Sequence, residues 1–287
     1  MDYVPPDELL SGALALAEKK ANLSMRDLLI RGFLAGAILA YATSLALVVV
    51  AQGAAPIVGA VLFPAGFVIL VLLGLELATG NFALLPMGLA ADRLTLGRTL
   101  RNWVAVYAGN LAGSLFYAAL FYLAVTSVNT APGGALGDLV KAAAQKKTLG
   151  YMAVGLRGWE AAFIKGILCN WMVTLGAVLA LVSRSTLGKI VAMWLPILTF
   201  FAQGYEHSIV NMFVIPAGRM FGAPVSLGQW WWWNQIPVTL GNIVSGVLLT
   251  GLALYVTFKP EKPAPVVIQS EISPPAEPAL EQASPAA

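Results

Sequence analysis

One polar cluster interrupts an apolar run of this chain and contains its only histidine, in the stretch QGYEHSIVNMFVIPAG at 203–218. Glu206, His207 and Ser208 are residue types found in hydrolases, where the imidazole would act as the base. Adjacent residues on a helix do not face one another, however, and no nucleophile-elbow or oxyanion pattern accompanies them. The cluster, which also includes Asn211, is therefore not expected to be an enzyme active site.

The residue counts argue against metal and cofactor chemistry. The 287 residues include one histidine and one cysteine, Cys169. These two side chains cannot supply the four ligands of a metal site or a bis-histidine haem, and a single cysteine cannot form an intramolecular disulfide. We therefore expect no metal, no cofactor and no catalytic residue.

The composition predicts a membrane protein. Hydrophobic residues make up 59% of the chain and charged residues only 11%. A helix needs roughly 20 mostly apolar residues to cross the hydrocarbon core of a bilayer. Apolar segments recur at 33–51, 54–75, 103–125, 161–182, 190–202 and 236–258. The sequence therefore predicts an all-α polytopic membrane protein with six transmembrane helices, rather than a globular protein with a large core.

The distribution of lysine and arginine predicts the orientation in the membrane. Placing both termini in the cytoplasm puts most of the 17 basic residues on that side, as the positive-inside rule requires. Residues 1–30 are then a cytoplasmic amphipathic helix, and 31–258 form the six-span transport domain in the inner (plasma) membrane. The segment 259–287, rich in Pro, Ala and Glu, is expected to be a disordered cytoplasmic tail. A long outer loop is expected at 128–158.

The chain also repeats itself. ELATGNFALLPMG (76–88) and EHSIVNMFVIPAG (206–218) share Glu, Asn, Pro and Gly in register. In the same order, IRGFLAG matches IKGILCN and GNLAGSL matches GNIVSGV. These matches indicate two homologous three-helix halves, at about 31–125 and 161–258. Because each half has an odd number of spans, the second is inverted relative to the first, a construction typical of channels and transporters.

Helices 2 and 5 are expected to be broken. The segment 54–91 is too long for one crossing, and 190–218 is interrupted at 204–211. Polar side chains and free backbone groups at membrane depth are tolerated only where they are buried in protein or line a wet cavity. Two helix N-termini would then meet at mid-membrane and favour an anion. The residues that interrupt the first segment are Glu76, Thr79, Gly80 and Asn81.

His207 lies at the second of these breaks. A structural imidazole is the alternative, but an ionisable group at this depth favours a functional role, and imidazole changes its charge between pH 5 and 8. Glu76 and Glu206 occupy equal repeat positions and are expected to brace the breaks structurally. Lys165 either snorkels toward the interface or attracts anions into a vestibule, and the two roles are compatible.

The segments LELATGN, KGILCNWMV, YEHSIVNMFVIP and NQIPVTLGNIVSG resemble the signature segments of the formate/nitrite transporter family, and together they indicate a resemblance over 25–258. The resemblance implies an aquaporin-like fold of six helices and a homopentamer with one pore per protomer. It also implies permeation of small monovalent anions such as formate, nitrite or hydrosulfide. By position it implies pore residues that contact the substrate, namely His207, Thr79, Asn170 and Lys165, and Asn211 of the polar cluster is expected to join them.

The resemblance also implies hydrophobic constrictions. These would be lined by Phe63 and Phe67 from the second span and by Phe201 on the cytoplasmic side. Near the centre they would be lined by Leu77, Ala78 and Val173. Several formate-type members carry an aromatic residue at the position of Ala78, so the substrate within the family stays open.

The expected function is a channel or transporter for a small anion, with formate favoured, and not an enzyme. Its partners would be the anion, protons, the lipid bilayer and further copies of the chain, with no nucleic acid. Protonation of formate by His207, with hydrogen bonds from Thr79 and Asn170, would remove most of the cost of dehydrating an anion in an apolar constriction.

Three alternatives use the same residues or the same general plan. A passive channel with a pH gate is compatible with the same pore residues, and so is a nitrite or hydrosulfide channel. A water or glycerol channel is less favoured, because the chain lacks the paired Asn-Pro-Ala segments of that family.

Overall fold

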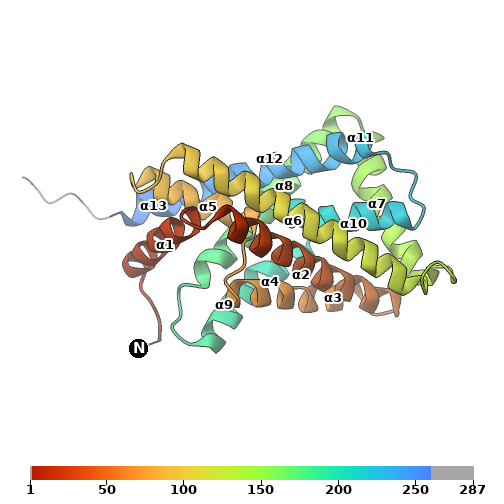
Figure 1. The fold of residues 1–287 in the computed structure, drawn as a ribbon, viewed down its shortest axis with the longest axis horizontal. Helices are drawn as coiled ribbons and strands as arrows, with labels where there is room; N and C mark the ends of the chain where they lie inside the picture. Colours follow the sequence, from red (N-terminus) through yellow and green to blue (C-terminus); the bar gives the residue numbers. More distant parts are fainter. Residues whose placement is uncertain (1, 260–287) are drawn as a thin grey trace, which may run out of the picture.

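The computed structural model describes residues 2–259, and its elements there are helices (Figure 1). Within this range no β-pairing occurs beyond one isolated bridge between Tyr3 and Ser183. In chain order the helices are α1 (Pro6–Ala21), α2 (Met25–Ala51), α3 (Pro56–Leu62), α4 (Pro64–Leu72), α5 (Ala78–Ala90), α6 (Leu96–Val125), α7 (Gly134–Met152), α8 (Leu156–Leu179), α9 (Thr186–Ala202), α10 (Ser208–Met220), α11 (Leu227–Trp230), α12 (Ile236–Val244) and α13 (Ala253–Phe258), with π-helical turns at Trp231–Gln235 and Ser245–Leu252.

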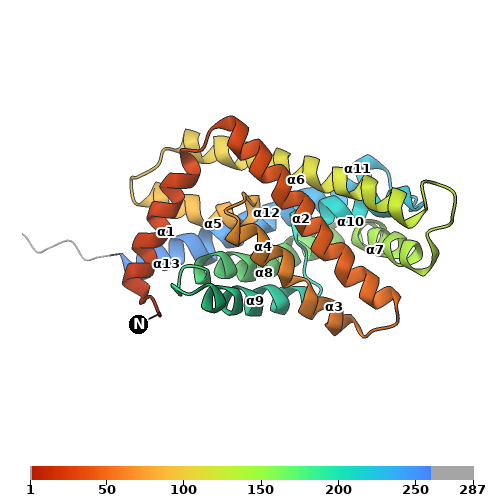
Figure 2. The same cartoon turned by 60° about the horizontal axis from the view of Figure 1, so that its bottom comes forward.

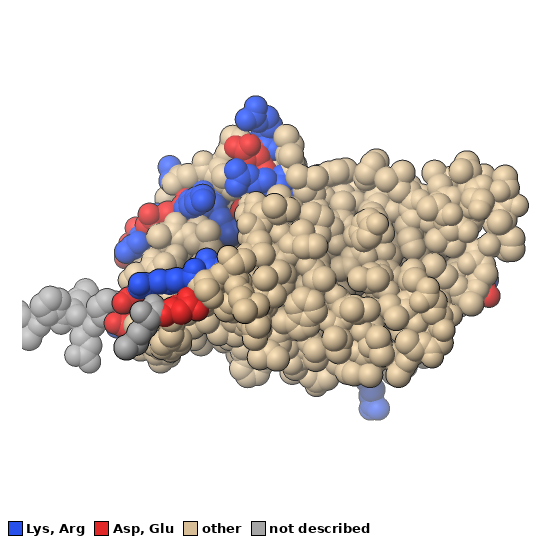
Figure 3. All heavy atoms as spheres, turned by 90° about the horizontal axis from the view of Figure 1, so that it is seen from below, with Lys and Arg blue, Asp and Glu red and all other residues tan. Residues whose placement is uncertain are grey.

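Several of these helices have the length and composition of membrane spans. In the described range, four are long and apolar enough to cross a bilayer, namely Met25–Ala51, Leu96–Val125, Leu156–Leu179 and Leu227–Phe258. Two shorter apolar stretches occur at Pro56–Leu72 and Thr186–Ala202. On the face shown in Figure 3, charged side chains gather mainly at one end and the middle of the surface is almost free of them. This distribution is expected of a protein whose middle lies in lipid.

Two helices are interrupted inside the bundle, and a glycine ends each of them. Gly74 follows α4 with a φ of +65°, and Gly204 follows α9 with a φ of +67°. These left-handed values favour glycine, which has no Cβ to clash with the backbone. After a few residues a new helix begins, α5 at Ala78 and α10 at Ser208. The breaks therefore leave two helix N-termini in the interior of the protein.

The helices α5 and α10 form the buried centre of the fold. Their residues 78–88 and 208–218 are buried without interruption. The helix α1 lies at one end of the molecule and packs on α5, whereas α7 lies at the opposite end and packs on α10 (Figures 1 and 2). The helices α2 and α6 run side by side, as do α8 and α12. Each end of the molecule thus has a covering helix that contacts one of the two central helices.

The helix α7 (Gly134–Met152) lies within the segment 128–158, which was expected to be a loop. Its buried residues Gly137, Val140, Ala144 and Thr148 recur every three or four positions. Val140 and Ala144 lie against Gly218 of α10. A helix with one narrow apolar face is stabilised mainly by such packing, so composition alone does not reveal it.

The N-terminal helix is shorter than the expected segment 1–30. It ends at Ala21, and α2 begins at Met25, where the side chain of Ser24 accepts the Asp27 N–H at 3.0 Å and caps the new helix. Of the expected tail 259–287, only Lys259 belongs to the described residues, so the disorder expected there lies outside them.

The first residues are tied to the loop that follows α8. The Asp2 carboxylate accepts hydrogen bonds from the Ser183 hydroxyl at 2.8 Å and from the Arg184 and Ser185 N–H groups at 2.8 and 2.6 Å. These hydrogen bonds lower the pKa of the Asp2 carboxyl below its usual value, and the bond from the Ser183 hydroxyl has the largest effect. Any stability that this tie contributes is therefore lost as the pH falls through the lowered pKa.

Candidate functional site

The two breaks bring Thr79 and His207 together at the centre of the protein. Thr79 Oγ1 lies 3.1 Å from His207 Nε2, and both residues are buried. The other ring nitrogen, Nδ1, accepts the Val210 N–H at 3.2 Å. A neutral imidazole that accepts at Nδ1 carries its proton on Nε2, so His207 donates to the Thr79 hydroxyl. Phe200 stacks on the imidazole at 5.8 Å between ring centroids and limits its rotation.

Asn170 from α8 completes this centre. Its Nδ2 donates to the backbone oxygens of Thr79 at 3.1 Å and Asn242 at 2.7 Å. Its Oδ1 is buried and has no hydrogen-bond donor among residues 2–259. Three of the residues expected in the pore, His207, Thr79 and Asn170, therefore converge, although they come from α8 and from both breaks.

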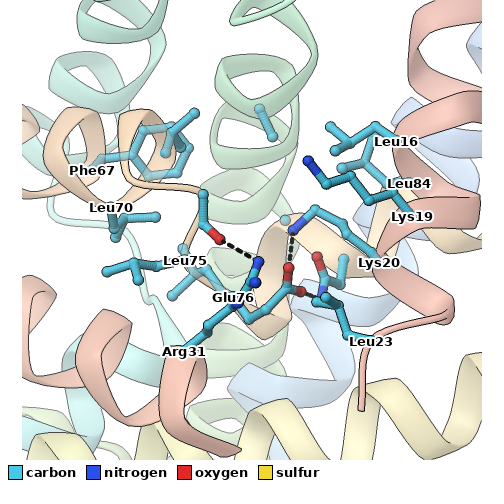
Figure 4. A pocket seen from close by; sticks show the side chains of 16 residues that line it. Leu16, Lys19, Lys20, Leu23, Arg31, Phe67, Leu70, Leu75, Glu76 and Leu84 are labelled. Atoms are coloured by element: carbon cyan, nitrogen blue, oxygen red, sulfur yellow. Dashed lines mark hydrogen bonds and ion pairs between the residues drawn. The ribbon is translucent and has the colours of Figure 1, made fainter. Parts of the chain in front are cut away.

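A cavity of about 120 Å³ leads from the α1 end of the molecule toward this centre. Phe67, Leu77 and Gly80 are among the residues that line it, and Gly80 directly follows Thr79 in the chain. Figure 4 shows Lys19, Lys20 and Arg31 around the same cavity, so three cationic side chains from α1 and α2 line it. Such a charge distribution raises the local concentration of anions.

The aromatic side chains expected at the constrictions lie in two groups. Phe63 stacks on Phe201 with 4.0 Å between ring centroids. Phe67 lines the cavity near α1, whereas Phe63 and Phe201 do not. Ala78 and Val173 are fully buried, and Leu77 almost so. Phe67, but not Phe63 or Phe201, thus lines the cavity near α1, and the apolar residues expected near the centre are buried.

Glu76 is held in a closed ring of polar side chains at the first break. Lys20 of α1 binds its Oε1 at 2.9 Å, and Asn81 donates to its Oε2 at 2.8 Å (Figure 4 shows the lysine contact). Asn81 also donates to Asn102, and Asn102 donates back to the Lys20 carbonyl oxygen. The ring joins α1 to the break.

Glu206 is held in the same way at the second break. Lys147 of α7 binds its Oε2 at 2.8 Å and Asn211 donates to the same oxygen at 2.8 Å. Asn211 donates to Asn234, and Asn234 donates to the Lys147 carbonyl oxygen at 2.9 Å. Tyr151 adds a bond to Oε1 at 2.8 Å. The Asn211 amide is therefore bound within this ring rather than to Thr79 or the His207 ring.

Lys165 lies at the second break, close to the Glu206 ring. Its ammonium group is 5.4 Å from the centroid of the Tyr151 ring, and its backbone oxygen accepts the Glu206 N–H at 3.4 Å. The side chain is partly exposed. Its backbone thus holds the break, while its charge lies over an aromatic face.

Two asparagines that were not selected as site residues clamp the breaks. Asn110 Oδ1 accepts the Ala78 N–H at 3.0 Å, and its amide group donates to Gly32 O and Glu76 O. Asn242 does the same at the other break. It accepts the Ser208 N–H at 3.0 Å and donates to Gly166 O and Glu206 O.

The repeat contained a signal for these residues. Asn110 and Asn242 occupy the same position in the matched segments GNLAGSL and GNIVSGV. Lys20 and Lys147 were also not selected. Glu76 and Glu206 lie at equal repeat positions beside apolar segments, and a buried carboxylate requires a cationic partner. This requirement could have predicted a lysine or arginine beside each of them.

The chain is similar to known membrane transport proteins over most of its length. A family model described as a formate/nitrite transporter matches residues 7–256. A "Probable formate transporter" of Methanothermobacter thermautotrophicus is 36% identical over 275 residues, covering 90% of this chain and 98% of the relative. The "Formate channel FocA" of Escherichia coli strain K12 is 34% identical over 224 residues, covering 72% of this chain and 75% of the relative.

Two solved structures have a similar fold. One, described as an "FNT family ion channel", has a TM-score of 0.73 and 28% identity, and the match covers 87% of this chain and 98% of the other. The second, described as a "Pentameric formate channel with formate bound", has a TM-score of 0.65 and 25% identity, with coverage of 82% and 97%.

Proposed function

The chain belongs to the formate/nitrite transporter family, and we propose that it is a channel through which formate crosses the plasma membrane together with a proton. The observation that carries this proposal is the meeting of Thr79 and His207 at 3.1 Å, with Asn170 bonded to Thr79, between apolar layers. Formate is favoured over nitrite because the relatives named above are a probable formate transporter and a formate channel.

We propose the matching architecture: six membrane helices in two inverted repeats, 31–125 and 161–258, with both termini in the cytoplasm. The equal contacts at the two breaks support it, since Lys20 and Lys147 bind equivalent glutamates and Asn110 and Asn242 clamp equivalent backbone groups. The amphipathic segment 1–30 and the tail 259–287 lie on the cytoplasmic side in this arrangement. Five copies assemble, each with its own pore, as the similarity to a pentameric formate channel suggests.

The charges and apolar layers divide the passage into an attractive entrance and a costly centre. An anion approaches through the cavity lined by Lys19, Lys20 and Arg31. Lys165 acts in the same way at the opposite end. Beyond the entrance, Phe67 and Leu77 replace the water around the anion by hydrocarbon, which is unfavourable for a charge. Protonation of formate removes the charge, and with it most of this cost.

In this proposal His207 relays that proton. A proton taken up at Nδ1 turns the ring into an imidazolium, whose Nε2–H faces the Thr79 hydroxyl. Protonation requires the Val210 N–H to leave Nδ1, so the charged ring exists only while that hydrogen bond is open. The neutral resting ring therefore gates the relay.

The proposal predicts a steep pH dependence of formate uptake. In proteoliposomes with a fixed inward formate gradient, flux should fall by up to about tenfold per pH unit between pH 5 and 8, because each formate crosses with one proton relayed by His207 and the proton activity falls tenfold per unit. His207→Phe keeps an aromatic ring beside Phe200 but removes both nitrogens, and should give a lower flux with a shallower pH dependence. Nitrite, acetate and hydrosulfide are measured in the same vesicles.

The matched control is Trp171→Phe on α8, a substitution of one aromatic side chain by another at a position that is 40% exposed. It should keep the flux and the pH profile. Equal pH slopes for the unaltered protein and His207→Phe would contradict the relay. Absence of formate flux, or a nitrite flux that exceeds it, would contradict the choice of formate.

A further inference from the structure

The cavity at the α1 end of the molecule has a strongly positive lining. Lys19 and Lys20 from α1 and Arg31 from α2 line it, and their side chains extend toward one another around it (Figure 4). Among the described residues that line the cavity, Glu76 is the one acidic residue. Three positive charges and one negative charge meet there, so the lining has a net charge of +2.

Two of these positive charges are not compensated by the protein. Lys20 binds Glu76 at 2.9 Å, so the charges of this pair cancel. The ion pairs of residues 2–259 include neither Lys19, which is exposed, nor Arg31. Arg31 uses one N–H to donate to the Gly74 carbonyl oxygen at 3.4 Å. A guanidinium group has five N–H donors, so the others are available to a ligand.

The size and the donors of the cavity fit a small oxyanion with two charges. About 10–15 Å³ is enough for one water molecule, so a cavity of about 120 Å³ has room for a tetrahedral oxyanion with waters around it. A guanidinium group binds oxyanions through parallel N–H bonds, and an ammonium group adds a compact charge. The Coulomb attraction is proportional to the charge of the ligand, so it favours a dianion over a monoanion.

We propose that this cavity binds a small divalent oxyanion, and that the bound dianion blocks the passage from the α1 end. The inference rests on the proposed function, because a block requires a permeating molecule. Phe67 and Leu77 line the same cavity, and apolar surroundings are unfavourable for a charge. One proton neutralises formate, but it leaves a dianion with a negative charge. The dianion is therefore held at the entrance and does not continue to the centre.

The repeat provides similar charges at the opposite end of the molecule. The segments AEKKANLSM of the first half and AQKKTLGYM of the second are similar, and in them Lys146 is the counterpart of Lys19. Lys165 is the counterpart of Arg31 in the matched segments IRGFLAG and IKGILCN. A difference between the two ends must therefore come from other residues.

Tyr151 makes the two ends different. The helix α1 ends directly after its two lysines, whereas α7 continues for a further turn that carries Tyr151. The Tyr151 hydroxyl donates to Glu206 at 2.8 Å, and the centroid of its ring lies 5.4 Å from the Lys165 ammonium group. The charge of Lys165 thus lies over an aromatic ring, whereas its counterpart Arg31 lines the cavity. The block by a dianion is therefore one-sided.

The experiment measures inhibition of formate uptake by sulfate in proteoliposomes of the full-length protein. The helix α13 packs on α1, so a C-terminal affinity tag captures vesicles whose α1 end faces outward. External sulfate should inhibit the captured vesicles at least about tenfold more strongly than the uncaptured ones, the effect of one charged hydrogen bond. Perchlorate has the same four-oxygen shape but a single charge, and should inhibit the captured vesicles at least about tenfold more weakly than sulfate.

Three variants test the residues of the site. Arg31→Gln should raise the sulfate concentration at half inhibition about tenfold, because it removes a charged hydrogen-bond donor. Lys19→Gln should raise it about threefold, because an exposed charge contributes less. Lys146→Gln is the matched control, since it removes the counterpart charge at the opposite end, and should leave the half-inhibition concentration unchanged.

The possible results separate the site from the transport activity. Equal inhibition by sulfate and perchlorate, equal inhibition from both sides, or undiminished inhibition in Arg31→Gln overturns the site. Absence of formate uptake contradicts the proposed function instead. The site is then tested by equilibrium binding of radiolabelled sulfate to the purified full-length protein, which should be weaker in Arg31→Gln than in Lys146→Gln. Equal binding to these two variants overturns the site.

Discussion

Replacing Lys147 with methionine is expected to lower the free energy of unfolding by about 3 kcal/mol or more. The Lys147–Glu206 pair lies at 2.8 Å, and the glutamate side chain is only 4% exposed. Methionine leaves the carboxylate buried with neutral donors alone, which do not compensate its charge. The measurement is the midpoint of thermal unfolding of the purified protein in one detergent, compared with the unaltered chain.

Two controls test whether the buried charge is the cause. Glu8→Gln breaks the pair with Arg184, whose side chains are 54% and 65% exposed, and should change stability by less than about 1 kcal/mol. The double variant Lys147→Met with Glu206→Gln has no buried charge to compensate and should recover part of the lost stability. A double variant as unstable as Lys147→Met would show that packing, not charge, determines the loss.

Gly113→Val is expected to prevent the protein from reaching its folded state. A Cβ at this position would overlap the carbonyl oxygen of Phe33 and lie 2.7 Å from its carbonyl carbon. Both are backbone atoms of α2, so no side chain can move aside and the two helices must separate. Membrane helices depend on such close contacts between small residues, because lipid provides little hydrophobic force to hold them together. The yield of monodisperse protein in size-exclusion chromatography measures the effect.

The control lies on the same helix. A Cβ at Gly97 would have no heavy atom within 4 Å, so Gly97→Ala should give a normal yield. If Gly113→Val also eluted as a monodisperse species with the unfolding midpoint of the unaltered protein, the close contact between α2 and α6 would be wrong.

The parts of the fold that depend on local properties could be predicted from the sequence. Each of the six apolar segments lies for most of its length in helices, because burial in lipid or protein requires long runs of apolar residues whatever their partners. The interruptions at or just after the ends of the second and fifth apolar segments follow from glycine and polar residues, which end the helix there. Gly74 and Gly204, which adopt positive φ values, are examples.

The helix α7 and the two lysine–glutamate rings could not be predicted in this way. Lys20 and Glu76 are 56 positions apart, and Lys147 and Glu206 are 59 apart. No local sequence pattern predicts which lysine pairs with which glutamate, because the pairing depends on how α1 and α7 pack at the two ends of the molecule.

By itself, the sequence determined that this is a helical membrane protein whose apolar segments are interrupted at two polar breaks, which contain Thr79 and His207, whereas Asn170 became a candidate for the centre only through the family resemblance. Apolar length, helix-ending residues and costly polar groups are properties of the chain alone. Only the tertiary structure decided that His207 Nε2 faces Thr79 and that the Asn170 amide donates to Thr79 and Asn242. The Val210 N–H that occupies Nδ1 is a local helix cap three residues away, but Thr79 reaches His207, and Thr79 and Asn242 reach Asn170, only when the helices pack.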